Sequence, residues 1–355
     1  MNKFFQKIKE DKRWQMGLVI AIVLLITIIV FLYFRFSDTD NPFERLVSGD
    51  TYRKLDGVMV DKEKVNPPIV AVMIENLSTI RDTQAGLDTA PVVYEALAEG
   101  GITRFLVIFP DLDVADIAAT RIGPVRSARP YYYEWSSEYD ALYTHVGGSP
   151  EALAGISGLG IPDLNAMYSD SVYFWRDTAL AAPHNLFING QNLSFALRDK
   201  DMLDLQPDYQ GWKYEDEASS DDRGSGENDV TIDFSSIGYV VKWDYDQNDN
   251  EYYRFNAGEK HIDFNTGQQI TADNVIVQYV NATDTGDNGR LSMDVTGNGT
   301  AVMFRNGMTY EGTWEKDSRE DRTLFYTEDG KEYTLNRGTT WVEIIPPDRD
   351  VEYSL

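Results

Sequence analysis

The stretch that decides the fold is VVYEALAEGGITRFLVIFP, which runs from Val92 to Pro110. Two strand-like apolar runs flank Gly100 and Gly101, and adjacent glycines between such runs are typical of a β-hairpin. The letters EALAE alone would also suit a helix. The hairpin is therefore an interpretation that the neighbouring segments have to support.

Strands and helices alternate on either side of this hairpin. Upstream, IVAVMIEN begins at Ile69 and is typical of a short buried strand. Downstream, ALYTHV (141–146) is a second buried strand, and Ser149 and Pro150 then suit the N-cap and first turn of a helix. This alternation predicts an α/β domain, a mixed sheet with helices, over residues 67–214.

Three further segments complete this predicted domain. Pro130 opens PYYYEWSSEYD, which predicts a helix with proline in its first turn. The run SVYFWRD (171–177) predicts another strand. Asn189 or Asn192 would cap a last helix.

The composition changes after residue 214. Residues 215–229 read EDEASSDDRGSGEND, which has no core-forming pattern and predicts an exposed acidic linker. Beyond it, turn signals such as Asn306-Gly307 and Asp329-Gly330 separate short apolar runs. This density of turns predicts a β-rich second domain over residues 230–350.

Composition excludes several classes of protein. The 355 residues carry a formal charge of −26, and 42% are hydrophobic and 12% aromatic, which is too apolar for a disordered chain. The acidity argues against nucleic acid as a partner, because phosphate binding needs a basic face. The absence of cysteine excludes disulfides, thiolate metal sites and a lipid-modified N-terminal cysteine.

Residues 16–34 (MGLVIAIVLLITIIVFLYF) carry no formal charge and are long enough to span a bilayer as a helix. The basic tail at 1–15 predicts a cytoplasmic N-terminus, and residues 35–66 read as an extracytoplasmic stalk. The alternative is a cleaved signal peptide, but the run is long and no Ala-x-Ala site follows it. Residues 1–35 hold six basic and two acidic side chains, which leaves a formal charge of −30 on the exported part.

Seven segments between residues 72 and 346 form a specific combination: VMIENL (72–77), GLDTAPVVYEALAEGGITRFL (86–106), RIGPVRSARPY (121–131), HVGGSPEA (145–152), FWRD…APHNLF (174–187), YYRFNAGEKHIDFNTGQQITADNVIV (252–277) and TWVEIIP (340–346). Together they resemble the YerB-like family of bacterial cell-envelope proteins. The resemblance implies a two-part domain, an extracytoplasmic location and no established activity. The chain departs from the family in two ways. A transmembrane helix replaces the acylated cysteine, and residues 81–84 (RDTQ) lack the proline expected after Arg81.

The most unusual local feature is a run of three arginines without any acid between residues 116 and 134. Arginine pairs carboxylate or phosphate in a bidentate manner, so the run could form an anion pocket. The alternative is that the arginines neutralise buried acids such as Glu95 and Glu99. The arginines are Arg121, Arg126 and Arg129.

The turn after ALYTHV could contribute to the same pocket. His145 ends the strand, and the N–H groups near Gly148 and Ser149 at a helix start could bind an anion. The alternative is a tight strand-to-helix turn. We also assign Asp177 and His184 to the candidate pocket. No metal site is predicted, because the histidines lack ligand spacing and more often hold loops by hydrogen bonds.

The sequence favours a single-pass, extracytoplasmic binding or scaffold module at the cell envelope. Its partner would be an anionic wall component or another envelope protein, and we expect no cofactor. The alternative is an envelope enzyme acting on a glycan or a phosphoryl ester. If Glu95 and Glu99 shared one strand, their Cα atoms would lie roughly 13 Å apart, which does not support a retaining glycosidase.

Overall fold

A computed structural model describes residues 51–110, 120–225 and 228–353 of the chain. The predicted tail and membrane span and most of the predicted stalk lie outside these residues. Within the described ranges, no helix is long and apolar enough to cross a membrane. Residues Tyr52–Leu355 form one compact unit, which contains both hydrophobic cores and all of the sheets described below.

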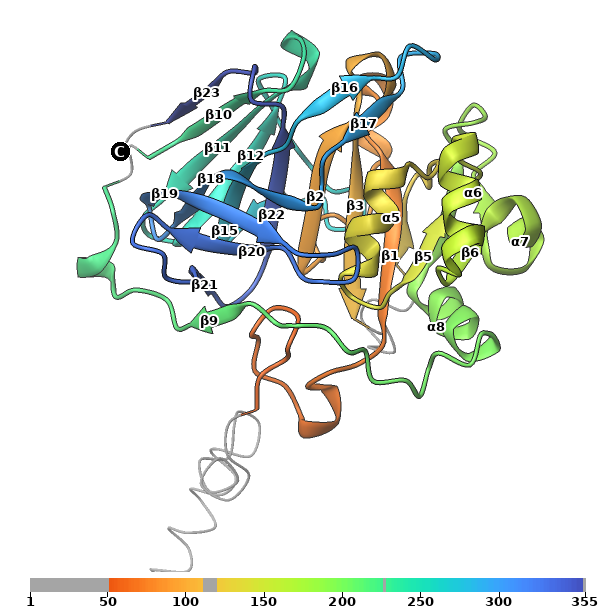
Figure 1. The fold of residues 1–355 in the computed structure, drawn as a ribbon, viewed down its shortest axis with the longest axis horizontal. Helices are drawn as coiled ribbons and strands as arrows, with labels where there is room; N and C mark the ends of the chain where they lie inside the picture. Colours follow the sequence, from red (N-terminus) through yellow and green to blue (C-terminus); the bar gives the residue numbers. More distant parts are fainter. Residues whose placement is uncertain (1–50, 111–119, 226–227, 354–355) are drawn as a thin grey trace, which may run out of the picture. The chain divides into compact units, whose positions relative to one another are not determined.

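The unit is built on a ten-stranded sheet with the order β20-β19-β18-β15-β22-β2-β3-β1-β5-β6 (Figure 1). Strands from both predicted domains share it, because β2 pairs in parallel with β22 and places Glu95 opposite Glu343. The boundaries at 214 and 230 stay predictions. The strands are β1 (Ile69–Glu75), β2 (Val92–Leu97), β3 (Thr103–Pro110), β5 (Leu142–His145), β6 (Asp163–Asn165), β15 (Asn274–Tyr279), β18 (Gly297–Arg305), β19 (Met308–Lys316), β20 (Leu324–Thr327) and β22 (Thr340–Ile345).

The predicted hairpin is confirmed. Strands β2 and β3 pair antiparallel, with the one-turn 3-10 helix η3 (Glu99–Gly101) between them. Gly100 and Gly101 have φ of 67° and 76°, the left-handed region that glycine adopts at little cost. Every residue of β2 is buried, because both faces of the sheet are covered. Tertiary packing therefore overrides the helical propensity of EALAE.

The α-helices of the described residues belong to the N-terminal part: α5 (Pro130–Ser137), α6 (Pro150–Leu159), α7 (Ala166–Tyr173) and α8 (Gly190–Asp199). The predicted caps are confirmed, since Ser149 and Asn189 accept bonds from the backbone of Ala152 and Asn192. The strand predicted over residues 171–177 is largely wrong, because α7 continues to Tyr173. Only β7 (Trp175–Arg176) is extended, and it pairs with β8 (Leu186–Asn189), which also pairs with β4 (Arg121–Ile122).

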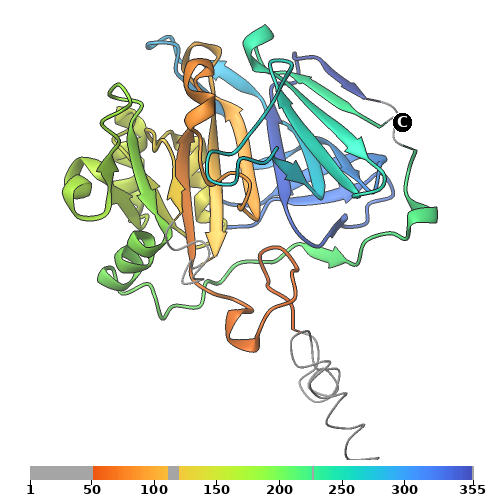
Figure 2. The same cartoon turned by 180° about the vertical axis from the view of Figure 1, so that it is seen from behind.

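The C-terminal part is β-rich, as predicted. A second sheet has the order β13-β12-β11-β10-β23, with β14 paired to β12 (Figure 2). Its strands are β10 (Val230–Asp233), β11 (Val240–Asp246), β12 (Glu251–Asn256), β13 (Glu259–Lys260), β14 (Thr271–Ala272) and β23 (Val351–Tyr353). Two short pairs complete the part: β16 (Ala282–Asp284) with β17 (Leu291–Met293), and β9 (Lys213–Glu215) with β21 (Thr334–Asn336).

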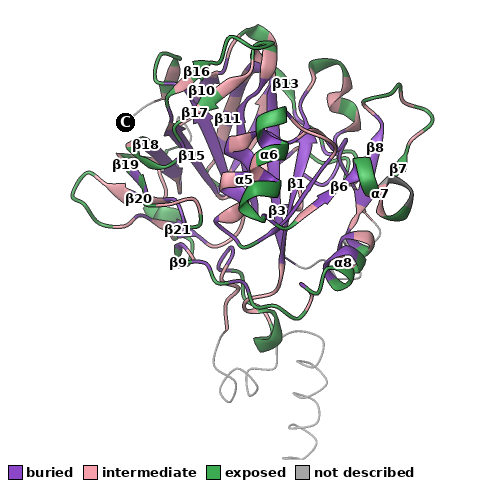
Figure 3. Cartoon of the chain, turned by 45° about the vertical axis from the view of Figure 1, so that its right-hand side comes forward, coloured by how far each residue is buried: buried purple, intermediate pink, exposed green. Residues whose placement is uncertain are grey.

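Two cores cover the two faces of the large sheet (Figure 3). Successive strand residues point to opposite faces. Val93 therefore joins the core shared with β10 and β11, whereas Tyr94 joins the core shared with α5. The polar clusters described below lie in or beside these two layers.

Candidate functional site

The predicted arginine segment runs along the carboxyl end of β1. Strands β1, β5 and β6 are parallel neighbours, so their carboxyl ends meet at one edge, where α/β sheets commonly bind ligands. The backbone of Arg126 connects two of these strands: its N–H donates to Met73 of β1, and its carbonyl accepts from Val146 after β5. Ala128 then donates to the carbonyl of Gly147. The sheet edge thus fixes the backbone that carries Arg126 and Arg129.

Three side chains form a surface group that we call the edge cluster: Glu75, Arg126 and His184. The Nε atom of Arg126 lies 3.2 Å from a carboxylate oxygen of Glu75. The Nδ1 atom of His184 lies 2.8 and 2.9 Å from the two carboxylate oxygens, to which its N–H donates. Glu75 is buried, whereas the side chains of Arg126 and His184 are 17% and 27% exposed. Two basic groups that reach solvent therefore share one carboxylate.

Arg129 pairs with a different acid. Its Nε atom and Nη2 of Arg104 both contact Glu99, the latter at 3.1 Å. Burial alone would raise the pKa of Glu99, but the hydrogen bond from Arg129 and the charges of both arginines hold it below its usual value. Neutralisation of acids such as Glu99 is the alternative to an anion pocket that the sequence left open, and the structure shows Arg129 paired with Glu99.

Arg121 meets Asp177, another residue assigned to the pocket, at 3.1 Å. Its guanidinium lies 3.7 Å from the ring centroid of Phe187 and 4.3 Å from that of Phe264, in cation–π contact with both. Asn265 donates to the carbonyl of Arg121. The side chain thus joins the β4–β8 region to a loop of the C-terminal part.

The turn at His145 is closed by internal bonds. The buried His145 ring bonds to the carbonyl of Gly147 at 2.7 Å and to Asp163 at 3.1 Å, so both nitrogens have partners. Gly148 forms a β-bridge with Ala128, and the N–H of Ser149 donates to Ala128. These contacts are those of a tight strand-to-helix turn.

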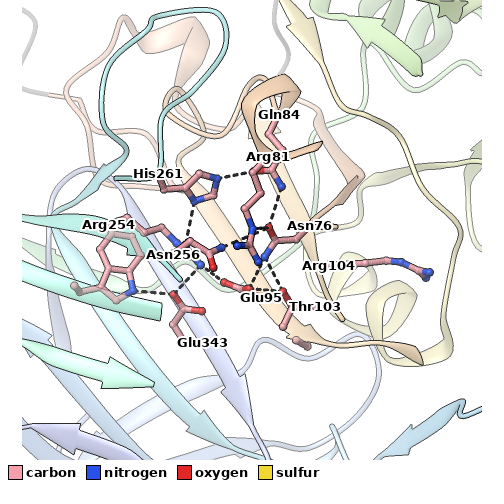
Figure 4. Close-up of polar contacts among 12 residues, drawn as sticks. Asn76, Arg81, Gln84, Glu95, Thr103, Arg104, Arg254, Asn256, His261 and Glu343 are labelled. Carbon is pink, nitrogen blue, oxygen red and sulfur yellow. Dashed lines mark hydrogen bonds and ion pairs between the residues drawn. The ribbon is translucent and has the colours of Figure 1, made fainter. Parts of the chain in front are cut away.

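A second polar group lies inside the protein, and sequence reasoning missed it. We call it the buried ring: Arg254, His261, Gln84, Asn76 and Glu95 (Figure 4). Arginine can only donate, so Nδ1 of His261 accepts from Arg254 at 3.0 Å, and its proton sits on Nε2. Nε2 then donates to Gln84 at 2.6 Å, Gln84 to Asn76 at 3.1 Å, and Asn76 to Glu95 at 3.0 Å. Arg254 also donates directly to Glu95, which closes the ring.

The bond directions in the ring require neutral His261. Burial, followed by the charges of Arg254 and Arg81, lowers the pKa of His261 well below its usual value. Burial and the neighbouring Glu95 raise the pKa of Glu343 well above its usual value. Glu343 accepts from the indole of Trp243 at 2.8 Å, and its second oxygen is buried without a hydrogen-bond partner. If Glu343 is protonated and donates to Glu95, this accounts for its raised pKa and gives its second oxygen a partner.

The buried ring is bonded to the edge cluster, and the positions of its acids differ from one sequence expectation. Gln84 donates to the backbone carbonyl of Glu75, which links the two groups. Glu99 lies in η3 rather than on β2, so Glu95 and Glu99 do not share a strand. The close carboxyl pair is Glu95 and Glu343, and both are fully buried. One signal could have found it: each acid stands alone within an apolar strand, VVYEAL and TWVEII.

The architecture defines a class: a two-part α/β protein whose parts share one sheet and are joined through buried ionic contacts. Comparisons agree. The N-terminal model of a protein family of unknown function, DUF3048, matches residues 55–203, and its C-terminal model matches residues 230–342. The chain belongs to this YerB-like family.

YerB of Bacillus subtilis matches the chain both in sequence and in structure. The chain is 28% identical over 310 residues to a protein described as "Putative lipoprotein YerB", covering 84% of this chain and 88% of the relative. The crystal structure of the YerB protein superposes with a TM-score of 0.73 at 26% identity, covering 85% of this chain and 99% of the other. The 355 residues of this chain contain no cysteine.

Proposed function

We propose that the chain is a membrane-anchored, extracytoplasmic binding module that recognises an anionic group of the cell envelope at the edge cluster. The apolar run 16–34 and the name of the Bacillus relative support the location. The ligand group would be a carboxylate or a phosphate on a wall component or on another envelope protein.

One observation carries the proposal: Arg126 and His184 share the single carboxylate of Glu75 while both reach solvent. Arginine offers five N–H donors, and Glu75 and the carbonyl of Pro183 contact two of the guanidinium nitrogens. A ligand anion would therefore complete the bonding of both side chains.

Titration of the fragment 52–355 with glycerol phosphate and N-acetylalanine, followed by NMR, tests the proposal. We expect one of the two probes to bind, and Arg126→Gln to weaken binding at least about tenfold, since a charge-assisted bond contributes about 1.5–3 kcal/mol. Arg126→Lys should lose less. The matched control is Arg198→Gln, because Arg198 is an exposed arginine on α8.

Two results would overturn this function. The first is that neither probe shifts any resonance of the native fragment at millimolar concentration. The second is that both probes bind Arg126→Gln as well as the native chain. Unfolding of each variant in urea separates lost binding from lost structure.

A second candidate, an envelope enzyme acting on a phosphoryl ester or a glycan, is favoured by the contact between His184 and Glu75. A carboxylate that holds Nδ1 of a part-exposed imidazole is an arrangement that general bases use. The variant His184→Gln separates the two functions. Loss of turnover of a model ester with binding intact would support the enzyme.

A further inference from the structure

The helices α6, α7 and α8 lie at the β5–β6 end of the large sheet (Figure 1). Several of their apolar side chains are exposed. Tyr168 is 89% exposed, and Met167 and Val172 are each 66% exposed. Monomeric soluble proteins seldom show such a patch unless it binds something. Of the thirteen large hydrophobic residues exposed in the described part of the chain, six lie on α6, α7 and α8: Leu153, Leu159, Met167, Tyr168, Val172 and Phe195.

The patch borders a groove of about 700 Å³ between α6, α7 and the end of α8. Leu153 and Tyr168 line it, and the buried side chains Ile156, Ile161 and Leu164 form its apolar base. A groove of this kind takes one apolar face of a helical segment, with side chains spaced three and four residues apart.

The walls of the groove are held in place by the protein itself. The side-chain oxygen of Asn165 accepts from the N–H groups of Gly147 and Met167, each at 3.0 Å, which fixes the start of α7. A Cβ atom at Gly147 would lie 3.6 Å from Cγ of Met167, so α7 approaches the turn closely. Ser149 caps α6 on the other side. The groove is therefore present before any partner arrives.

Acids outnumber bases among the residues that line the groove. Asp163 and Asp199 line it with side chains 31% and 50% exposed, whereas Glu151 on α6 lies outside the lining and 4.0 Å from Arg290. The bases are Lys200, which also lines the groove, and Arg198, which lies 3.5 Å from Asp199. A second copy of the chain would bring an equally acidic face, and an anionic bilayer would be repelled. Charge complementarity therefore selects a basic occupant.

We propose that this groove binds an amphipathic helical segment, rich in lysine or arginine outside its apolar face, from another protein of the cell envelope. Tyr168 and Leu153 contact the apolar face, and Asp163 and Asp199 attract the basic flanks. The site is separate from the edge cluster and does not depend on the anion-binding function.

Fluorescence anisotropy with the fragment 52–355 tests this proposal. The probe is a labelled 18-residue helix with leucine on one face and lysine elsewhere, compared with a peptide in which glutamate replaces lysine. We expect the lysine peptide to bind in the micromolar range, and Tyr168→Ser with Met167→Ser to raise its Kd at least about tenfold. Asp163→Asn with Asp199→Asn should raise Kd several-fold at low salt and less at high salt.

Ile237→Ser is the matched control, because Ile237 is 87% exposed on the 3-10 helix η5 (Ile237–Tyr239), an element outside the groove. If the lysine peptide binds the native chain and the Tyr168 variant equally, the binding is a non-specific attraction and the proposal is overturned. Equal binding of the glutamate peptide would also overturn it. Self-association or binding to anionic vesicles that Tyr168→Ser abolishes would assign the patch to a second copy or to the bilayer instead.

Discussion

Two buried charge clusters lie on opposite faces of the ten-stranded sheet, and each balances its charge differently. The buried ring faces the six-stranded sheet and, with Glu343, places two acids beside Arg254. Arg81, which is part-buried, also donates to Asn76 of the ring at 3.0 Å. On the face toward α5, Glu138 accepts from Lys316 and Arg322, each at 2.7 Å. We call this second group the Glu138 cluster. It has one acid and two bases, all buried.

The two clusters hold buried charge in different ways. Near the ring, burial and the neighbouring Glu95 raise the pKa of Glu343, which favours its neutral, protonated form. In the Glu138 cluster, the surplus positive charge is solvated by the protein: Lys316 donates to three backbone carbonyls, and Arg322 lies 3.6 and 4.0 Å from the ring centroids of Trp212 and Tyr139. Both clusters bond residues before 214 to residues after 230, so we expect the two parts to unfold together.

The largest effect should come from Arg254→Met. This change leaves Glu95 buried without its cation and removes the donor that sets the direction of the ring. Breaking a buried pair by deleting one partner costs about 3–5 kcal/mol. Urea unfolding of the fragment 52–355 should show this loss in a single transition.

The double variant Arg254→Met with Glu95→Gln is the control, because it removes both charges. It should recover most of the lost stability. A loss below about 1 kcal/mol for Arg254→Met alone would mean that water reaches the ring, and two separate transitions would break the link between the parts.

Glu138→Gln should cost somewhat less, about 2–4 kcal/mol near neutral pH. Burial lowers the pKa of Lys316, although Glu138 opposes that shift. Without the acid, the folded chain loses the Lys316 proton at a lower pH than the unfolded chain does. The unfolded state then binds more protons, so the stability of the variant should rise with pH toward the ordinary lysine pKa.

Unfolding curves of Glu138→Gln between pH 7 and 10 provide the measurement. The native chain is the reference at each pH, and Arg198→Gln controls for a lost surface charge. A stability deficit that stays constant or deepens with rising pH would show that Lys316 is not the source of the cost.

The hairpin, the helix caps and the β-rich C-terminal part could be predicted because local signals decide them. Gly100-Gly101 needs positive φ, and Ser149 with Pro150 is a local start signal. The end of α7 could not be predicted, because a short apolar run suits helix or strand equally until its packing is known. The match of β2 with β22 is a contact across more than 240 residues, and no local pattern encodes it.

The candidate site divides in the same way. The arginines were visible as a basic run, and Glu99 could be named as one acid for them to neutralise, but the pairing of Arg126 with Glu75 depends on which strands are neighbours. The ring was hidden because its members come from five separate segments. His261 looked like any loop histidine until Arg254 and Gln84 were placed beside it.

The smallest effect, and the sharpest test of the contrast, is Glu343→Gln. The amide keeps an acceptor for Trp243 and a donor for Glu95, so at pH 5 the stability should change by less than about 1 kcal/mol.

The pKa of Glu343 is raised in the folded chain, so the unfolded chain releases this proton first as pH rises above about 4.5. The native protein therefore loses stability with rising pH at this site, until the folded pKa is passed. Glutamine has no proton to release. The free energy of unfolding of the variant should therefore rise relative to that of the native chain by up to about 1.4 kcal/mol per pH unit above pH 5. Parallel stability curves for the two proteins from pH 5 to 8 would mean that Glu343 is ionised inside, and that both clusters solvate their surplus charge in the same way.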